Sequence, residues 1–302
     1  MNNQDLIDQI KKLKEKKNAV ILVHNYQRPE IYEVADFIGD SYGLSKKATE
    51  TKSAIIVFCG VDFMAESAYI LNPQKTVLIP TKMAKCPMAA MVDVNGLKEF
   101  KAKYPEAAVV SYVNTSADVK AESDICCTSS NAVKVVNSLV ENEIIFVPDS
   151  NLASYVIKNT AKKIRPWNGW CYVHNQFSLE GLIQSKELHF DAKVLVHPEC
   201  TPEVVELADE VCSTSGMINY VRKSKDKKFI IATEIGIIER LKIEFPDKIF
   251  FQAPPGGTCL QMKKTTLPLV LESLKKEQFK VTVPEDVRIR AKKALDRMLN
   301  VG

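Results

Sequence analysis

Apolar residues in this chain gather in short runs, and between the runs they recur every three or four positions. The runs AVILV (19–23), AIIVFCG (54–60) and KVLV (193–196) are typical of strands buried in a parallel sheet. Segments such as DFMAESAYILN (62–72) have the helical period and begin beside a residue that can cap a helix. The regular alternation of strand and helix patterns predicts an α/β fold.

The strand–helix pattern occurs three times along the chain. Residues at two places in it recur with spacings of 88 and 85: His24, Tyr112 and His197 at the ends of the first strands, and Ser41, Ser129 and Thr214 further on. Each copy is too short to bury a large core alone, so the copies should pack on one another. We expect three homologous three-layer α/β/α units with the order β-α-β-α-β and boundaries at 1–106, 107–192 and 193–302. The first unit includes an N-terminal helix, and the third includes a C-terminal helix.

Charge and hydropathy narrow the class of protein. The 302 residues carry a formal net charge of +4, and the lysines are scattered through helical segments, so we expect no nucleic-acid partner. The longest apolar runs, about six residues, are far too short to cross a membrane. The chain begins with a charged amphipathic segment and not with a signal-peptide core. A cytoplasmic protein with reduced cysteines is therefore expected.

Three of the eight cysteines share one place in the repeat. Cys86, Cys171 and Cys259 are 85 and 88 residues apart, and each follows the third strand of its unit in a loop rich in proline or glycine. If the units are related by a pseudo-threefold axis, these loops converge and three thiols meet at one point. Thiolates in a reducing compartment favour a metal centre.

Two kinds of metal centre fit these cysteines. Structural zinc takes four ligands, so zinc would need a fourth ligand such as His174, three residues after Cys171. An iron–sulfur cluster bound through three cysteines is the stronger candidate, because one iron is then free to act on substrate as a Lewis acid. The remaining cysteines are expected to be small buried apolar residues.

Other stretches are distinctive in sequence, among them HNYQRPE (24–30), ADFIGDS (35–41), GVDFMAE (60–66), CPMA (86–89), YVNT (112–115), CTSSNAV (127–133), VHPEC (196–200), STSGM (213–217) and TEIG (233–236). In these stretches, and over nearly its whole length, the chain resembles the quinolinate synthase (NadA) family of NAD biosynthesis. The resemblance implies three homologous domains around a central cavity, with a [4Fe–4S] cluster on Cys86, Cys171 and Cys259.

The resemblance also implies a reaction. Iminoaspartate and dihydroxyacetone phosphate would condense to quinolinate, with loss of phosphate and two waters. An L-aspartate oxidase would supply the unstable iminoaspartate, in transient contact with this chain. The expected partners are therefore small anionic molecules and one supplying enzyme, with no nucleic acid and no membrane.

The expected catalytic residues project from the strand ends, because ring formation needs proton transfers, enolisation and two dehydrations. Glu199 is assigned as the main general acid or base. Tyr26 and Tyr112 are assigned as proton relays or as donors to an enediolate. His24 is assigned as a donor to phosphate or carboxylate.

Substrate binding is expected from residues that can face anions. Ser41, Ser129 and Thr214 lie near predicted helix starts, where hydroxyls and backbone N–H groups favour negative charge. Asn114 and His197, near the ends of first strands, are expected to orient the substrate, together with His24, Tyr112 and Glu199.

Each of these residues also has an ordinary structural interpretation. The hydroxyl residues could serve only as helix N-caps, and a strand-end tyrosine or histidine is often a satisfied structural residue. Two further functions use the same features. One is a hydro-lyase that acts on a different hydroxy acid through the open iron, and the other is a non-catalytic module that captures a small dicarboxylate.

Overall fold

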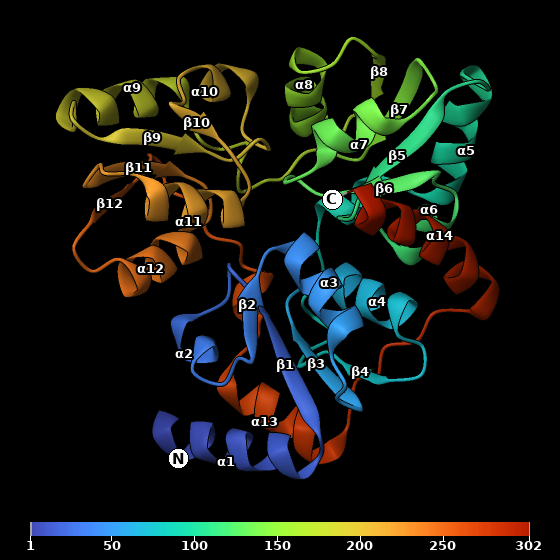
Figure 1. The fold of residues 1–302 in the computed structure, drawn as a ribbon, viewed down its shortest axis with the longest axis vertical. Coiled ribbons are helices and arrows are strands. Elements are labelled where there is room, and N and C mark those ends of the chain that lie inside the picture. Colours follow the sequence, from blue (N-terminus) through green and yellow to red (C-terminus); the bar gives the residue numbers. More distant parts are fainter. Residues whose placement is uncertain (1, 302) are drawn as a thin grey trace.

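The computed structural model describes residues 2–301 and contains three parallel sheets of four strands each. Figure 1 shows them as three lobes around a common centre, with helices on both sides of each sheet. The first strand of each unit takes an inner position, between the short second strand and the third strand. The predicted α/β architecture of three α/β/α units is confirmed.

The first sheet has the order β2-β1-β3-β4. Its strands are β1 (Ala19–His24), β2 (Phe37–Gly39), β3 (Ile55–Cys59) and β4 (Thr76–Leu78). One face packs against α1 (Asn3–Lys16), α2 (Pro29–Tyr32) and α13 (Leu267–Lys276). The other face packs against α3 (Ser41–Glu50) and α4 (Asp62–Leu71).

The second sheet repeats this arrangement in the order β6-β5-β7-β8. Its strands are β5 (Ala108–Tyr112), β6 (Ile125–Cys127), β7 (Glu143–Val147) and β8 (Lys163–Pro166). Helices α5 (Val94–Lys103) and α6 (Ala117–Ala121) pack on one face. Helices α7 (Ala132–Ser138) and α8 (Ser150–Lys158) pack on the other.

The third sheet has the equivalent order β10-β9-β11-β12. Its strands are β9 (Lys193–Val196), β10 (Glu210–Val211), β11 (Lys228–Ala232) and β12 (Ile249–Gln252). Helices α9 (Leu179–Leu188) and α10 (Pro202–Glu206) pack on one face, and α11 (Thr214–Lys223) and α12 (Ile235–Glu244) pack on the other. Two 3₁₀ turns, Met88–Met91 and Met262–Lys264, follow Cys86 and Cys259.

The second strand of each unit was not predicted, so the expected order of three strands per unit is wrong by one strand. These strands are two or three residues long and lie at sheet edges, so they give no apolar run. An aspartate precedes each of them and accepts a hydrogen bond from an N–H group near the start of the first strand. The three bonds run from Ile21 N to Asp36 (2.8 Å), from Val109 N to Asp124 (2.7 Å) and from Val194 N to Asp209 (2.8 Å).

The hydrophobic core joins the three units on one side of their sheets only. The faces covered by α3 and α4, by α7 and α8, and by α11 and α12 belong to one continuous cluster of buried residues. The opposite faces form three separate clusters, one for each unit. The units therefore depend on one another for burial on one face, as expected for copies with small cores.

The C-terminal helices pack away from the third sheet, although the sequence placed them in the third unit. Helix α13 packs against α1 and β3, and it contributes Leu267, Val270 and Leu271 to the core of the first unit. Helix α14 (Glu285–Val301) packs against α6, β6 and α4. Their apolar stripes find partners in the first two units, and this docking leaves no trace in the repeat pattern. The boundaries at 106 and 192 stay predictions.

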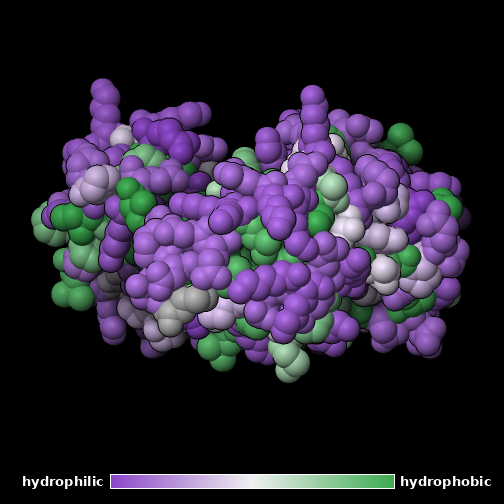
Figure 2. Space-filling model, turned by 90° about the horizontal axis from the view of Figure 1, so that it is seen from below, coloured by the Kyte–Doolittle hydropathy of each residue, from purple (hydrophilic) through white to green (hydrophobic). Residues whose placement is uncertain are grey.

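The outer surface is polar. Hydrophobic residues on the face seen in Figure 2 lie singly or in small groups among hydrophilic ones. Among residues 2–301, no helix combines the length and apolar character needed to span a bilayer.

Replacing Leu295 by alanine should lower the free energy of unfolding by about 2–5 kcal/mol, because this fully buried α14 side chain would leave a cavity. The control is Ile289→Ala on the same helix, where the side chain is 46% exposed and the change should stay within about 0.5 kcal/mol. Urea-induced unfolding measures both variants. Equal destabilisation by the two changes would contradict the docking of α14 through its apolar face.

Candidate functional site

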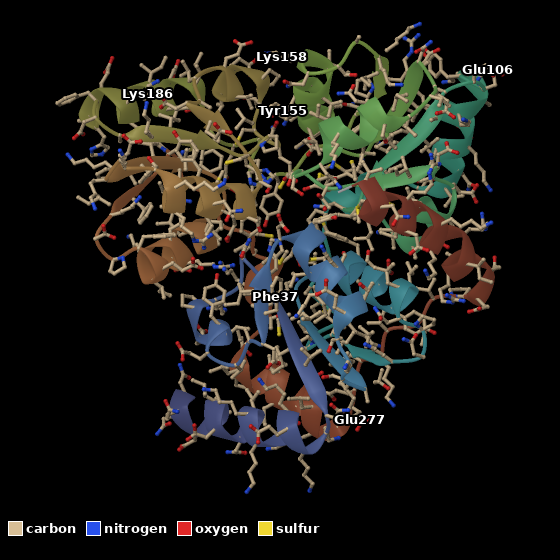
Figure 3. The ribbon with its side chains drawn as sticks, in the orientation of Figure 1. Phe37, Glu106, Tyr155, Lys158, Lys186 and Glu277 are labelled. Carbon is tan, nitrogen blue, oxygen red and sulfur yellow. The ribbon has the colours of Figure 1, made fainter. Side chains whose placement is uncertain are left out.

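A cavity lies where the carboxyl ends of the inner strands β1, β5 and β9 meet, as is usual for sites in open α/β sheets. It holds about 680 Å³ of space not filled by atoms. Every residue that the sequence predicted for catalysis, substrate binding or metal binding lines it: His24, Tyr26, Ser41, Cys86, Tyr112, Asn114, Ser129, Cys171, His197, Glu199, Thr214 and Cys259. Side chains from all three lobes converge between them in Figure 3.

Two of the strand ends carry histidines with matching hydrogen bonds. His24 accepts the backbone N–H of Tyr26 on Nδ1 (3.1 Å), and His197 accepts that of Glu199 on Nδ1 (3.4 Å). An imidazole that accepts on Nδ1 and is neutral carries its proton on Nε2. Burial lowers the pKa of each histidine to about 3, so both rings are neutral near pH 7. Each therefore offers one N–H donor to the cavity.

Glu199 is a buried carboxylate with a partner on each oxygen. Its Oε1 accepts a hydrogen bond from the Tyr112 hydroxyl, and its Oε2 lies 2.7 Å from His174 Nδ1. Only 3% of Glu199 is exposed. Burial acts to raise its pKa, but the neighbouring histidines and these hydrogen bonds outweigh burial and hold the pKa below its usual value. The carboxylate is therefore ionised near pH 7 and acts as an acceptor.

Two buried residues, His174 and Thr233, form a chain of close polar contacts between Glu199 and Tyr26. His174 Nε2 lies 2.8 Å from the Thr233 hydroxyl, which lies 2.7 Å from the Tyr26 hydroxyl. The His174 ring also stacks on His197, with ring centroids 4.4 Å apart. One direction of donation fits the hydroxyls, from Tyr26 to Thr233 and on to His174 Nε2. A ring that accepts on Nε2 carries its proton on Nδ1, which lies 2.7 Å from Glu199 Oε2 but outside hydrogen-bond geometry. Such a chain can carry a proton across the cavity.

The two tyrosines stay protonated in this setting. Burial raises the pKa of Tyr26 and of Tyr112 well above the usual value, and the negative charge of Glu199 adds to the effect on both. Each hydroxyl is therefore a donor at neutral pH. Asn114 offers a hydrogen-bond acceptor instead of a donor, because its Oδ1 is buried without a hydrogen-bond partner among the described residues.

The three predicted cysteines all line this cavity. Burial raises the pKa of Cys86 to about 12 and that of Cys171 well above the usual value. Glu199 and then the other two cysteines contribute further to the rise at Cys171, so the three sulfurs lie within electrostatic range of one another. Neutral buried thiols become thiolates when a metal binds, and metal binding releases their protons.

The surroundings of the thiols fit a thiolate-bound metal group. Each sulfur receives a hydrogen bond from the backbone of the residue three positions later, namely Ala89, His174 or Met262. Such bonds favour the thiolate form. The ligand atoms of Cys171, His174 and Glu199 also lie within 4.8 Å of one another. His174 Nε2 lies 2.8 Å from the Thr233 hydroxyl, whereas its buried Nδ1 has no hydrogen-bond partner among the described residues, so His174 still fits a metal site with Cys171 and Glu199.

The N-caps of α3, α11 and α7 are not Ser41, Thr214 and Ser129, but residues one or two positions away. Asp40 caps α3 by accepting the N–H of Gly43 (2.9 Å), and Ser213 caps α11 by accepting that of Gly216 (3.2 Å). Ser41 and Thr214 are the first residues inside these helices. Ser129 lies in the turn before α7, whose N-cap is Asn131. The hydroxyls of Ser41 and Thr214 are therefore not consumed by capping.

A wider cavity of about 1450 Å³ adjoins the first and shares Asp40 and Ser129 with it. The starts of α3 and α11 border this space, and Tyr155 of α8 lines it as well. Tyr155 and Lys158 are labelled in Figure 3 at the junction of the second and third units, where Lys158 pairs with Glu206. Helix starts carry partial positive charge, which suits a passage for anions.

Sequence reasoning missed several groups of the site. Asp40, Thr128 and Glu234 line the cavity, and Thr233 completes the hydrogen-bond chain. Thr233 and Glu234 directly follow β11, so they too stand at a strand end. Their place in the motif TEIG could have drawn attention to them. The sequence did not decide the role of His174, which in the structure lies between Glu199 and Thr233.

Comparison with known proteins agrees with this geometry. A family model described as "Quinolinate synthetase A protein" matches residues 8–300. Quinolinate synthase 1 of Methanosarcina acetivorans is 56% identical over 301 residues, which cover 100% of this chain and 99% of that protein. Quinolinate synthase of Alkaliphilus metalliredigens is 53% identical over 302 residues, covering 100% of both chains. The chain therefore belongs to the quinolinate synthetase A (NadA) family.

Proposed function

We propose that this chain condenses iminoaspartate with dihydroxyacetone phosphate to give quinolinate, a precursor in NAD biosynthesis, with release of phosphate and two waters. The observation that carries the proposal is the buried Glu199 carboxylate, held between Tyr112 and His174 in a cavity whose wall carries three thiols. The relatives named quinolinate synthase cover the whole length of the chain, which supports the same reaction.

The proposed cofactor is a [4Fe–4S] cluster bound by Cys86, Cys171 and Cys259. In support, the three loops are equivalent in the repeat, and each sulfur receives a backbone hydrogen bond that favours the thiolate. When bound, such a cluster supplies a Lewis-acidic iron beside the substrate.

Anionic groups of the substrates are proposed to bind to the hydroxyls of Ser41, Ser129 and Thr214. Thr214 is well suited to this, because its Oγ1 accepts a hydrogen bond from Asn25 Nδ2 (2.7 Å) and its own proton is left to donate. The Nε2–H groups of His24 and His197 add two neutral donors. Neutral donors bind phosphate and carboxylate without placing further charges in a buried site.

Proton transfer is assigned to the chain's own residues. Glu199, ionised and within reach of the cavity, accepts a proton from a substrate carbon or nitrogen. The Tyr112 hydroxyl, which donates to Glu199 Oε1 in the free site, turns its proton toward an oxyanion that develops on the substrate. His174 and Thr233 connect Glu199 with Tyr26, so that the proton can leave or return without bulk water.

The proposed substrate iminoaspartate also requires an enzyme that supplies it. Iminoaspartate is unstable in water, and an L-aspartate oxidase is its proposed source. The apolar wall formed by Phe63, Met88 and Met262 reduces the water around a bound imine. This part of the proposal concerns delivery only and is independent of the proton-transfer assignments.

Glu199→Gln should lower kcat by about 10²–10⁴-fold, because the amide cannot accept the proton that the carboxylate takes. Glu203→Gln is the matched control, since Glu203 is exposed on α10 nearby. Quinolinate formation from iminoaspartate, generated in the assay, and dihydroxyacetone phosphate measures both. A variant that keeps wild-type turnover would contradict the assignment of Glu199.

Thr233→Val should lower kcat by about tenfold or more with little change in KM, because it removes the two short hydrogen bonds through Thr233 while keeping the side-chain volume, and it leaves only the longer direct contact of 3.3 Å between Tyr26 and His174. Thr233→Ser restores the hydroxyl and should recover most of the activity. Steady-state kinetics across pH separates the two parameters. A rise in KM alone would assign Thr233 to substrate binding and not to proton transfer.

Single alanine replacements of Cys86, Cys171 and Cys259 should each prevent the protein from holding the full complement of about four irons per chain. Cys212→Ala serves as the control, because Cys212 is partly buried like the three but does not line the cavity with them. Iron, sulfide and the visible absorption spectrum are measured after anaerobic reconstitution. Iron-free wild-type protein that still forms quinolinate would overturn the cofactor assignment.

A further inference from the structure

Three acidic residues occupy equivalent places outside the strand ends discussed so far. Asp62, Asp149 and Glu234 are 87 and 85 residues apart and stand at the starts of α4, α8 and α12. Each accepts a hydrogen bond from its own helix start: Phe63 N to Asp62 (2.9 Å), Leu152 N to Asp149 (2.7 Å) and Gly236 N to Glu234 (2.7 Å). To this extent they are ordinary residues of helix starts.

Each of these carboxylates also holds one of the three cysteine loops. The backbone N–H of the cysteine donates to it: Cys86 N to Asp62 Oδ1 (3.2 Å), Cys171 N to Asp149 Oδ2 (3.1 Å) and Cys259 N to Glu234 Oε1 (3.0 Å). The same pairing of helix start and cysteine is therefore present in all three units. A structural coincidence in one unit would not repeat with the spacing of the repeat.

A second hydrogen bond runs between the same two segments in the opposite direction. A backbone N–H at the helix start donates to the carbonyl two residues before the cysteine: Asp62 N to Ala84 O, Ser150 N to Gly169 O and Ile235 N to Gly257 O, each 2.8 Å. We call the two bonds together the clip. It fixes both the position and the direction of the chain as it enters each cysteine.

The clip lies just beyond the last strand of each sheet. Each loop follows an edge strand of three or four residues, β4, β8 or β12. Two of the three carboxylates are withdrawn from water, since Asp149 and Glu234 are 0% exposed, whereas Asp62 is half-buried. By contrast, Asp93 caps α5 through Gly96 N alone (2.9 Å), so helix capping does not by itself require a second acceptor function.

We propose that Asp62, Asp149 and Glu234 are positioning residues that hold the three cysteine loops in their converging arrangement before any metal group binds. A backbone N–H left without its acceptor in a buried place is costly, so each of these hydrogen bonds resists displacement of its cysteine loop. The identity of the metal group rests on the proposed function, but the arrangement of the loops does not.

The three carboxylates differ in a way that gives a sharp test. Asp62 uses Oδ1 for both Phe63 N and Cys86 N, so asparagine can keep both bonds with its single oxygen. Asp149 uses one oxygen for Leu152 N and the other for Cys171 N. In Asp149→Asn one of the two N–H groups must face an NH₂ donor. Glu234 likewise uses both oxygens, so Glu234→Gln has the same defect and also loses the ion pair with Lys263 (3.1 Å).

The experiment measures backbone hydrogen exchange at the three cysteines, and alkylation rates of their thiols, in the full chain without metal. Asp149→Asn should speed exchange at Cys171, and Glu234→Gln exchange at Cys259, by about tenfold or more, whereas Asp62→Asn should change exchange at Cys86 by less than about threefold. Asp93→Asn, at the cap without a cysteine loop, is the matched control and should leave all three unchanged.

Two outcomes overturn the proposal: unchanged exchange at Cys171 and Cys259 in the variants, or equal acceleration in Asp62→Asn. If Asp149→Asn does not fold, Glu234→Gln carries the comparison. Anaerobic reconstitution of the same proteins follows, and iron uptake should fall in Asp149→Asn and Glu234→Gln but not in Asp62→Asn. Wild-type protein that takes up no iron while the exchange contrast holds would overturn the cofactor assignment and leave the clip standing.

Discussion

Convergence of the inner strands is the constraint on which the rest of this molecule depends. Because β1, β5 and β9 are flanked on both sides within parallel sheets, their carboxyl ends cannot shift without breaking two ladders of hydrogen bonds. The residues directly after these strands are therefore fixed to within the precision of a sheet. Loops alone would not hold Tyr26, Tyr112 and Glu199 within hydrogen-bonding distance of common partners.

Burial sets the protonation states of these residues. The same withdrawal from water that makes His24 and His197 neutral also keeps the tyrosines protonated. Glu199 resists this trend because it has partners on both oxygens. One charged acceptor surrounded by neutral donors is an arrangement that can take a proton from a substrate at neutral pH.

Much of this was predictable from the chain, and the reasons for the misses are physical. The inner strands are long apolar runs, and three copies of one pattern marked His24, Tyr112, His197 and the three cysteines. The edge strands β2, β6 and β10 were missed because two or three residues are too few to show a periodicity. Asp40 and Ser41 are both good capping residues, so the sequence could not decide which one caps α3. Thr233 and the docking of α14 depend on contacts between units, which a repeat within one unit does not encode.

The three repeats differ from one another at the residues that line the central cavity. The cysteines are the same on every arm, whereas the groups at the strand ends differ: His24, Tyr112 and His197 at one level, and Tyr26, Asn114 and Glu199 at the next. A cavity of true threefold symmetry would accept an irregular molecule in three equivalent rotations. These differences between the repeats favour one of the three orientations for a ligand without symmetry. The three cysteines, by contrast, remain equivalent.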